Sequence, residues 1–341
     1  MWLEVVGGPR VPGGASLTSV DSASSAPVDD PRHLAETLAP VLAEACEGRL
    51  SRVTWFRTDW QRGGAATGTA LYQVADGGTV AVVVKLPVVH RELLWMRRLQ
   101  DGGDNVVPRL YASGETLGGY DLSWLVIEHF DQGPLGTHWH DDHVTRIADA
   151  AARFQLAALT WPVDQPAHRE PWEDLIKEAQ KSLRNNPVQR RHQWRAALKT
   201  LRSHLHSIVE DWEARDTAQW VHGDLHLANA MSRESMESGP VCLIDLAEVR
   251  VGHWVEDAVY LERQLWARPQ RLKGHGPVKA IAAARRRWQL PVEDDYPRLA
   301  MIRRALLAGT ALGFLQSEGD PRYLGACLGW LERAVVELKL K

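Results

Sequence analysis

The sequence predicts an α+β fold with a small antiparallel sheet in its amino-terminal half and a larger, mainly helical carboxy-terminal half. The chain has 341 residues, a length that suits two lobes better than one small domain. Short runs rich in β-branched residues occur between residues 52 and 130, and helical spacing of apolar residues dominates after Gly136. We therefore expect an amino-terminal lobe at 31–130 and a carboxy-terminal lobe at 131–341.

Residues 1–30 are expected to form no stable structure. Gly, Pro, Ser and Ala dominate this segment, and such a composition buries little apolar surface. No continuous apolar block in it could serve as the core of a signal peptide. We leave open whether it belongs to the native protein.

The elements of the amino-terminal lobe follow from the spacing of apolar residues. Helices are predicted where these residues recur every three or four positions, at Pro31–Glu47 and His90–Leu99. Strands are predicted at the β-branched and aromatic runs 52–56, 69–74, 79–86 and 124–130, and another begins at Val106. Asp76-Gly77-Gly78 is a typical hairpin turn between two of these strands.

Lys85 stands out in this lobe because it ends a run of β-branched residues, where lysine is unfavourable. An exposed strand end is one explanation. The other is a lysine that binds phosphate and pairs with Glu92, which lies near the start of the next helix.

A second candidate for phosphate contact is the glycine-rich segment that contains Gly63 and Gly64. Glycines let backbone amides approach phosphates closely. The segment lacks the glycine spacing of known nucleotide-binding loops, so a plain flexible hairpin is an equal alternative.

The carboxy-terminal lobe is predicted to contain a series of helices with one apolar face. Their expected ranges are Val144–Leu159, Pro171–Leu183, Gln189–Asp211, His253–Trp266, Pro277–Trp288, Tyr296–Ser317 and Arg322–Leu340. The polar run His138–His143 precedes the first of them, and we expect Asp141 or Asp142 to cap that helix rather than to bind metal.

The most informative segment is Val221–Asn229, which is followed by the apolar run ending at Asp245. Asp224 could accept or orient a hydroxyl proton, and Asn229 and Asp245 offer the oxygen ligands that magnesium prefers. Their order and spacing match the catalytic loop and metal-binding Asp of kinases. His222 and His226 could suggest zinc, but no third ligand stands at zinc-like spacing.

Three anchors in this order resemble the aminoglycoside phosphotransferase and choline kinase superfamily of small-molecule kinases: His222-Gly223-Asp224 with Asn229, Ile244-Asp245, and Gly252 with Asp257-Ala258. Protein kinases carry Arg where this chain has Gly223, and the segment after Asp245 is too short to grip a peptide. The resemblance implies a protein-kinase-like two-lobe fold.

The resemblance also implies roles for single residues. Asp257 would brace the catalytic loop, and His222 would support it through backbone hydrogen bonds. The backbone carbonyl of Glu128 and the amide of Phe130 would meet the adenine edge. Some relatives place an acidic residue at the position of Glu248, so this residue is a candidate near metal or substrate.

The expected function is therefore transfer of the γ-phosphate of ATP or GTP, with Mg²⁺, to a hydroxyl of a small molecule. The acceptor could be an aminoglycoside-like antibiotic, an amino sugar or a related alcohol. A catalytically weak kinase-like binding module and a protein kinase are the alternatives. Acidic residues that could attract a polycationic acceptor are Glu256, Glu262, Glu293, Asp294 and Asp295.

Composition narrows the partners. A formal charge of −3 argues against nucleic acid, and no apolar run is long enough to span a bilayer. Cys46, Cys242 and Cys327 are too few and too far apart for a disulfide framework, which favours the cytoplasm. We expect a monomer or a homodimer that acts on a small molecule.

Overall fold

A computed structural model describes residues 31–57, 65–100, 106–235, 238–272 and 276–340. Contacts between residues divide the described chain into two compact units. The amino-terminal unit contains residues up to 133 together with 231–248, and the carboxy-terminal unit contains 134–230 together with 249–340. The segment that carries Asp245 thus belongs to the amino-terminal unit, although the sequence-based boundary placed it in the carboxy-terminal lobe.

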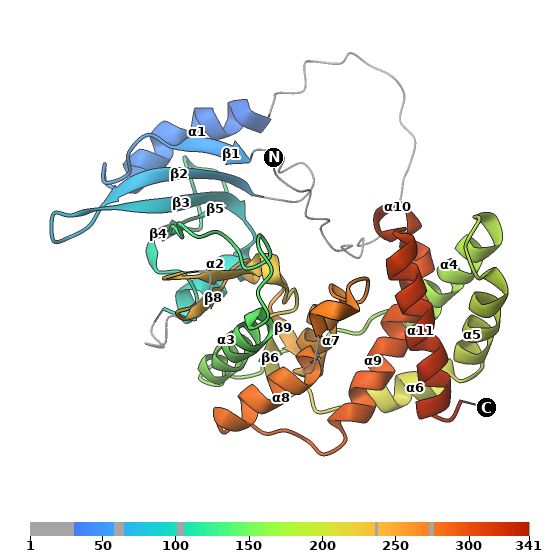
Figure 1. Cartoon of the computed structure of the whole chain (residues 1–341). Coiled ribbons are helices and arrows are strands. Elements are labelled where there is room, and N and C mark those ends of the chain that lie inside the picture. The colour runs from blue at the N-terminus through green and yellow to red at the C-terminus, as the bar shows by residue number, and fades with distance from the viewer. Residues whose placement is uncertain (1–30, 58–64, 101–105, 236–237, 273–275, 341) are drawn as a thin grey trace, which may run out of the picture. The chain divides into compact units, whose positions relative to one another are not determined.

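The amino-terminal unit is built on a five-stranded antiparallel sheet in the order β1-β2-β3-β5-β4 (Figure 1). Its strands are β1 Thr54–Arg57, β2 Ala66–Gln73, β3 Thr79–Val88, β4 Leu110–Gly114 and β5 Ser123–Glu128. The predicted turn between β2 and β3 is confirmed, because Val74 and Gly78 pair across it and Gly77 has a φ of 86°. Gly63 and Gly64 lie outside the described residues.

The core of this unit lies between one face of the sheet and helix α1 (Pro31–Ala45). Side chains alternate between the two faces of a strand, and Val82, Val84 and Leu86 of β3 pack with Leu38 and Leu42 of α1. Burial of these apolar side chains is what holds helix and sheet together.

The opposite face of β3 carries Lys85, and helix α2 (His90–Arg98) contributes Glu92 beside it. β3 continues to Val88, so Lys85 lies inside the strand and its side chain is only 17% exposed. The explanation of Lys85 as an exposed strand end is therefore wrong. The strand extends further because β5 continues to pair with it as far as Val88.

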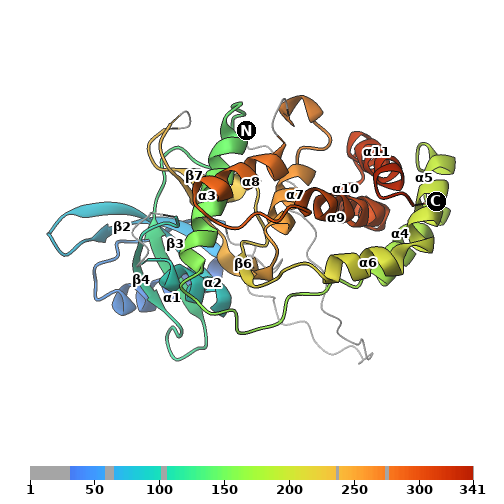
Figure 2. The ribbon, with the colours of Figure 1, turned by 90° about the horizontal axis from the view of Figure 1, so that it is seen from below.

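The carboxy-terminal unit is mainly helical (Figures 1 and 2). Its helices are α3 His143–Ala158, α4 Trp172–Asn185, α5 Arg191–Ser203, α6 Leu205–Glu213, α7 Val255–Arg263, α8 Pro277–Arg287, α9 Tyr296–Thr310, α10 Leu315–Glu318 and α11 Pro321–Glu337. Figure 2 shows α8 running beside α3, and the two helices pack on each other. No helix in the described ranges is long and apolar enough to cross a membrane.

Three predicted helix features are wrong. The range Tyr296–Ser317 is not one helix, because the 3-10 turn η5 (Ala311–Phe314) separates α9 from α10. The range Gln189–Asp211 forms two helices, because the backbone leaves the helical region at His204, with φ −113° and ψ 5°. Asp142 precedes α3 but caps it with no side-chain hydrogen bond. Its carboxylate instead accepts from His140 Nδ1 at 2.7 Å, and Asp141 accepts from Trp139 Nε1 at 3.2 Å.

The pairing of two short strands places the start of the predicted catalytic loop beside the start of strand β9. β6 (Gln219–Val221) is antiparallel to β9 (Arg250–Gly252), with Val221 opposite Arg250. The loop that follows β6 therefore starts at the same end of this strand pair as the chain that enters β9. The pairing of β6 with β9 thus joins two segments that are distant in the sequence.

Candidate active site

The loop His222–Asn229 follows β6 and ends in the short 3-10 helix η2 (Leu227–Asn229). Gly223 has a φ of 82°, a conformation that costs a residue with a side chain about 1–2 kcal/mol. The backbone conformation of Gly223 therefore explains why the His-Gly-Asp motif has a glycine at this position. The ring of His226 accepts a hydrogen bond from the amide of Ala228 at 3.2 Å and so begins η2.

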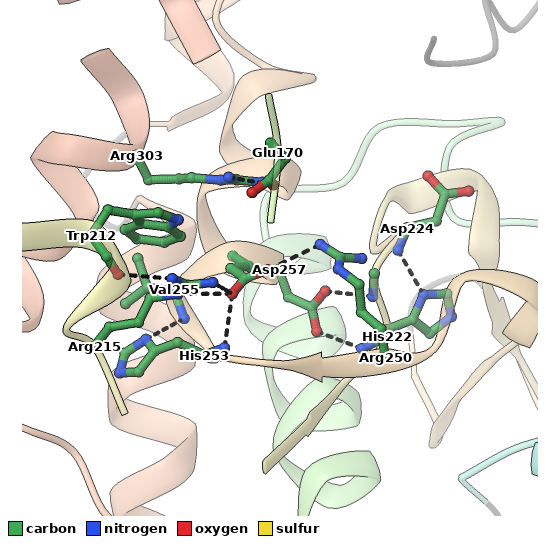
Figure 3. Close-up of polar contacts among 12 residues, drawn as sticks. Glu170, Trp212, Arg215, His222, Asp224, Arg250, His253, Val255, Asp257 and Arg303 are labelled. Atoms are coloured by element: carbon green, nitrogen blue, oxygen red, sulfur yellow. Dashed lines mark hydrogen bonds and ion pairs between the residues drawn. The ribbon is translucent and has the colours of Figure 1, made fainter. Parts of the chain in front are cut away.

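Asp257, at the start of α7, holds the backbone of this loop (Figure 3). Its carboxylate accepts from the amide of His222 at 2.8 Å and from the amide of Gly223 at 2.9 Å. The bond from His222 is buried and the bond from Gly223 is partly buried, and a lost partner is costly in such a setting. Burial raises the pKa of Asp257, and the two amides and nearby His222 and Arg250 oppose that rise.

Asp224 is surrounded by donors. Asn229 Nδ2 lies 3.0 Å from its carboxylate Oδ2 and 3.0 Å from its carbonyl oxygen, and His226 Nε2 lies 3.5 Å from Oδ2. Burial alone would raise the pKa of Asp224, but His226, Tyr260 and the charge of His222 together hold it below its usual range. The carboxylate is therefore ionised at neutral pH.

His222 is fully buried and takes part in the loop as the sequence suggested. Its Nδ1 accepts from the amide of Asp224 at 3.3 Å, and its ring meets Phe154 of α3 edge-on at 5.9 Å. These contacts fit the predicted role of His222 as a support of the loop. The effect of this support on catalysis stays a prediction.

A buried cluster of charged side chains surrounds Glu256, the residue before Asp257, and was not predicted from the sequence (Figure 3). Glu256 is 2% exposed, and its carboxylate accepts from Arg215 at 3.0 Å, from Arg250 at 3.0 Å and from the amide of His253 at 2.9 Å. Burial would raise the pKa of Glu256, but Arg250, Arg303 and Arg215 lower it to about 2. Glu256 thus ties β9, the segment before β6 and the start of α7 together.

Packing against this cluster explains why position 252 is occupied by a glycine, Gly252. A Cβ atom at its position would stand 2.8 Å from Glu256 Oε1, closer than such atoms approach. The glycine anchor of the motif therefore makes room for the Glu256 carboxylate.

In the amino-terminal unit, Lys85 lies between two acidic side chains. Its Nζ forms a close ion pair with Oε1 of Glu92, which is 5% exposed, and stands 4.0 Å from Oδ1 of Asp245. The pairing of Lys85 with Glu92 agrees with the sequence prediction. Asp245 has a φ of 62°, an unusual backbone conformation for which Asp has a higher tolerance than most residues. Its side chain is 42% exposed.

Glu128 ends β5, and its side chain ties three segments together. The carboxylate pairs with Arg233 and accepts from the amide of Arg109 at 3.0 Å. Arg233 also donates to the carbonyl of Val107 at 2.9 Å and lies 5.5 Å from the centre of the Phe130 ring. The strand end is thus held in place, and its contact with adenine stays a prediction.

Glu248 ends the short helix η3 (Leu246–Glu248), directly after Asp245. This helix packs against α2, the helix of Glu92. The role of Glu248 near metal or substrate stays a prediction.

The chain belongs to the APH phosphotransferase enzyme family, whose model matches residues 43–302. This result confirms the resemblance drawn from the motifs and the kinase-like fold class, and it defines the protein as a small-molecule kinase. No curated protein sequence matches the chain.

Two solved structures illustrate the fold. The chain is similar to a microcompartment-associated aminopropanol kinase, with 14% identity, a TM-score of 0.56 and coverage of 88% of this chain and 98% of that one. It is also similar to a thermostable mutant of aminoglycoside phosphotransferase APH(4)-Ia, with 14% identity, a TM-score of 0.50 and coverage of 88% and 98%. At these identities the likeness concerns the fold.

Proposed function

We propose that the protein transfers the γ-phosphate of ATP, with Mg²⁺, to a hydroxyl group of a small molecule. The observation that carries the proposal is the setting of Asp224. Asn229 and His226 hold its carboxylate, and Asp257 fixes the loop on which it stands. An ionised carboxylate in a fixed position is what an acceptor hydroxyl needs in order to be oriented.

In this proposal Asp224 orients the hydroxyl and accepts its proton as transfer proceeds. Its lowered pKa makes it a weak base, which suits a loose transition state in which the proton leaves late. Catalysis then depends on positioning and on charge stabilisation rather than on a strong base.

Lys85 would neutralise phosphate oxygens of the nucleotide, with Glu92 orienting its amine. The backbone of Glu128 and Phe130 would meet the adenine. We propose ATP as the donor, and GTP as the second candidate. Gly63 and Gly64 complete the proposed nucleotide-binding residues.

Magnesium would be held by Asn229 and Asp245. The amide nitrogen of Asn229 is committed to Asp224, so its amide oxygen is the end that can face a cation. Asp245 offers a partly exposed carboxylate. Phosphate oxygens of the nucleotide and water would complete the coordination of the ion, as Mg²⁺ usually keeps several waters. Bound Mg²⁺ would neutralise charge on the phosphates.

The acceptor is proposed to be an aminoglycoside-like antibiotic, an amino sugar or a related alcohol. The two similar structures carry names of enzymes for such compounds, an aminoglycoside and an aminopropanol. Not every acid considered from the sequence can attract the acceptor, because Glu256 and Glu262 are buried against arginines. Membership of the small-molecule kinase family sets the protein kinase alternative aside.

We further propose that the protein acts in the cytoplasm as a monomer or homodimer. Its three cysteines are buried and free, which fits a reducing compartment.

The test is to incubate the protein with ATP, Mg²⁺ and a panel of aminoglycosides, amino sugars and amino alcohols. Mass spectrometry then detects products heavier by one phosphate. A phosphorylated product supports the proposal. ATP binding without a phosphorylated product from any acceptor would favour the alternative of a weak kinase-like binding module.

Lys85 and Glu92 are expected to act as a coupled pair. Lys85→Ala should raise the ATP KM or lower kcat by about tenfold or more, because a charge-assisted contact to phosphate is lost. Glu92→Ala should produce part of that loss, and the double variant should lose little more than Lys85→Ala alone. Steady-state kinetics of the three variants measure the coupling, and additive losses would show that the residues act independently.

Asp245→Ala is expected to weaken binding of the magnesium–ATP complex more than binding of ATP in chelator. The reason is that its carboxylate is a proposed metal ligand. Isothermal titration calorimetry in the two conditions measures the difference. Equal losses with and without Mg²⁺ would remove Asp245 from the metal site.

A further inference from the structure

Arg233 contacts the side chains of both residues whose backbone is proposed to meet adenine. It directly follows strand β7 (Ala230–Ser232), which pairs with β8 (Val241–Leu243). Its Nη1 forms a close ion pair with both carboxylate oxygens of Glu128, and its Cζ lies 5.5 Å from the centre of the Phe130 ring. A single guanidinium thus contacts both residues of the proposed adenine edge.

The ion pair is part of a closed ring of hydrogen bonds. Arg233 Nη2 donates to the carbonyl of Val107 at 2.9 Å. The Glu128 carboxylate accepts from the amide of Arg109 at 3.0 Å, and the Glu128 amide donates to the carbonyl of Arg109 at 2.9 Å. The ring therefore runs through the guanidinium, the carboxylate and the segment from Val107 to Arg109. Members of such a network support one another, because none can turn without breaking a second bond.

These contacts require an arginine at position 233. Nη1 binds Glu128, Nη2 binds Val107 and the group lies over the Phe130 ring. A planar guanidinium has donors in several directions and a face that packs on aromatic rings, whereas a lysine ammonium is a compact point charge. The side chains of Arg233 and Glu128 are only 15% and 22% exposed, so salt screens this pair less than a surface pair.

We propose that Arg233 is a positioning residue for recognition of the nucleotide base. It holds the end of β5 in the conformation in which the backbone of Glu128 and Phe130 can meet a purine ring. The inference rests on the proposed function, in which these two residues contact adenine, and it adds a residue from outside the catalytic loop. Arg233 acts on the base, whereas Lys85 is the proposed contact for the phosphates. Loss of Arg233 should therefore weaken binding of the base and spare binding of the phosphates.

The test is Arg233→Met, which keeps an unbranched side chain and removes the guanidinium. The probes are ATP and inorganic tripolyphosphate, each with Mg²⁺, because the second has the phosphates without the base. We expect the affinity for ATP to fall by about tenfold or more, since hydrogen bonds to a charged group are lost. The affinity for tripolyphosphate should stay within about twofold of the wild-type value. Isothermal titration calorimetry measures both, and circular dichroism checks that the variant is folded.

Steady-state kinetics give a second readout. The KM for ATP should rise by about tenfold or more in Arg233→Met, while kcat stays within about twofold of wild type, because the groups that act on the acceptor are unchanged. A residue that only stabilises the fold would not separate KM from kcat in this way.

Arg97→Met is the matched control. Arg97, on α2, belongs to the same unit and also pairs with a glutamate, with Nη1 2.8 Å from Oε1 of Glu115. It also donates to the hydroxyl of Ser113 at 3.1 Å, and its side chain is 41% exposed. Its loss removes a guanidinium that contacts neither Glu128 nor Phe130 in the described structure, so both affinities should stay within about twofold of wild type.

A double-mutant cycle with Glu128→Gln shows whether Arg233 acts through this carboxylate. Each single variant should weaken ATP binding, and the double variant should bind ATP little worse than Arg233→Met alone. Additive losses would mean that the two residues act independently and would contradict the inference. If Arg233→Met does not fold, Glu128→Gln alone carries the test, because it keeps the shape of its side chain and should also weaken binding of ATP but not of tripolyphosphate.

The outcomes separate this inference from the proposed function. Wild-type affinity for ATP in Arg233→Met, or an equal loss for ATP and tripolyphosphate, would overturn the inference and leave the proposed function intact. A wild-type protein that binds ATP no more tightly than tripolyphosphate would also overturn it. A wild-type protein that binds no ATP at all would instead remove the proposed function and this inference together.

Discussion

Asp224→Asn is expected to lower phosphoryl transfer by about two to four orders of magnitude while ATP binding stays nearly unchanged. The amide that replaces the carboxylate cannot accept a proton from the acceptor hydroxyl. It also places an NH₂ group against donors, since Asn229 and His226 both point hydrogens at the carboxylate. Turnover measured with a hydroxylated acceptor, beside calorimetric titration of ATP, separates the two effects.

Asp216→Asn is the control for this change. Asp216 is an exposed residue shortly before β6, and its carboxylate accepts only a local backbone bond from Ala218 at 2.9 Å among the contacts described. An asparagine can keep that bond, so turnover should stay close to wild type. If the Asp224→Asn variant also kept wild-type turnover, Asp224 would be excluded as the group that orients the acceptor.

Glu256→Gln is expected to destabilise the fold by about 3–5 kcal/mol. The substitution keeps the shape of the side chain but leaves Arg215 and Arg250 beside a neutral amide, where they share a buried site without their counter-charge. Because Glu256 also fixes the turn into α7, the Asp257 brace should loosen and turnover should fall. Chemical denaturation monitored by circular dichroism gives the loss of stability.

The pH dependence of stability is a second, independent test of the role of Glu256. The pKa of Glu256 is about 2 in the folded protein and 4.5 in the unfolded chain, so the ionised form favours folding. That contribution of about 3 kcal/mol is fully present above pH 4.5 and is lost as the pH falls toward 2. The Glu256→Gln variant should therefore lose less stability than wild type between pH 5 and pH 3, by this reasoning about a single depressed pKa.

Glu332→Gln serves as the comparison for stability. Glu332 pairs with Arg190 at 3.2 Å, but both side chains are 44% exposed. Exposed pairs contribute about 0–1 kcal/mol, so this variant should unfold close to wild type. If Glu256→Gln is no more destabilising than Glu332→Gln, the buried cluster does not hold the loop.

The sequence predicted the parts of the site that short-range patterns encode. The run of β-branched residues along β3 identified a strand, and the misplaced charge at Lys85 indicated a partner on the next helix. The motif around Asp224 identified the catalytic loop because kinase chemistry needs those residue types in that order. These features depend on neighbours within about ten residues, which is the range over which periodicity and motif spacing carry information.

The features that the sequence did not predict depend on distant partners or on local competition. Glu256 meets Arg215 across 41 positions, and nothing near either residue indicates the pair. Asp142 lost its expected role as a helix cap because the ring of His140 competes for its carboxylate. Such outcomes depend on tertiary packing, which the secondary-structure propensities of single residues do not describe.

The most direct test of the account is the ratio of phosphoester formed to ATP consumed, measured by ³¹P NMR with an acceptor found in the panel. We expect one phosphoester on an acceptor hydroxyl for each ATP used by the wild-type protein, and at most about one hundredth as much phosphoester with Asp224→Asn over the same time. ATP consumed without a phosphoester, or equal product from the wild-type and Asp224→Asn proteins, would contradict the claim that Asp224 directs phosphoryl transfer to a small-molecule hydroxyl.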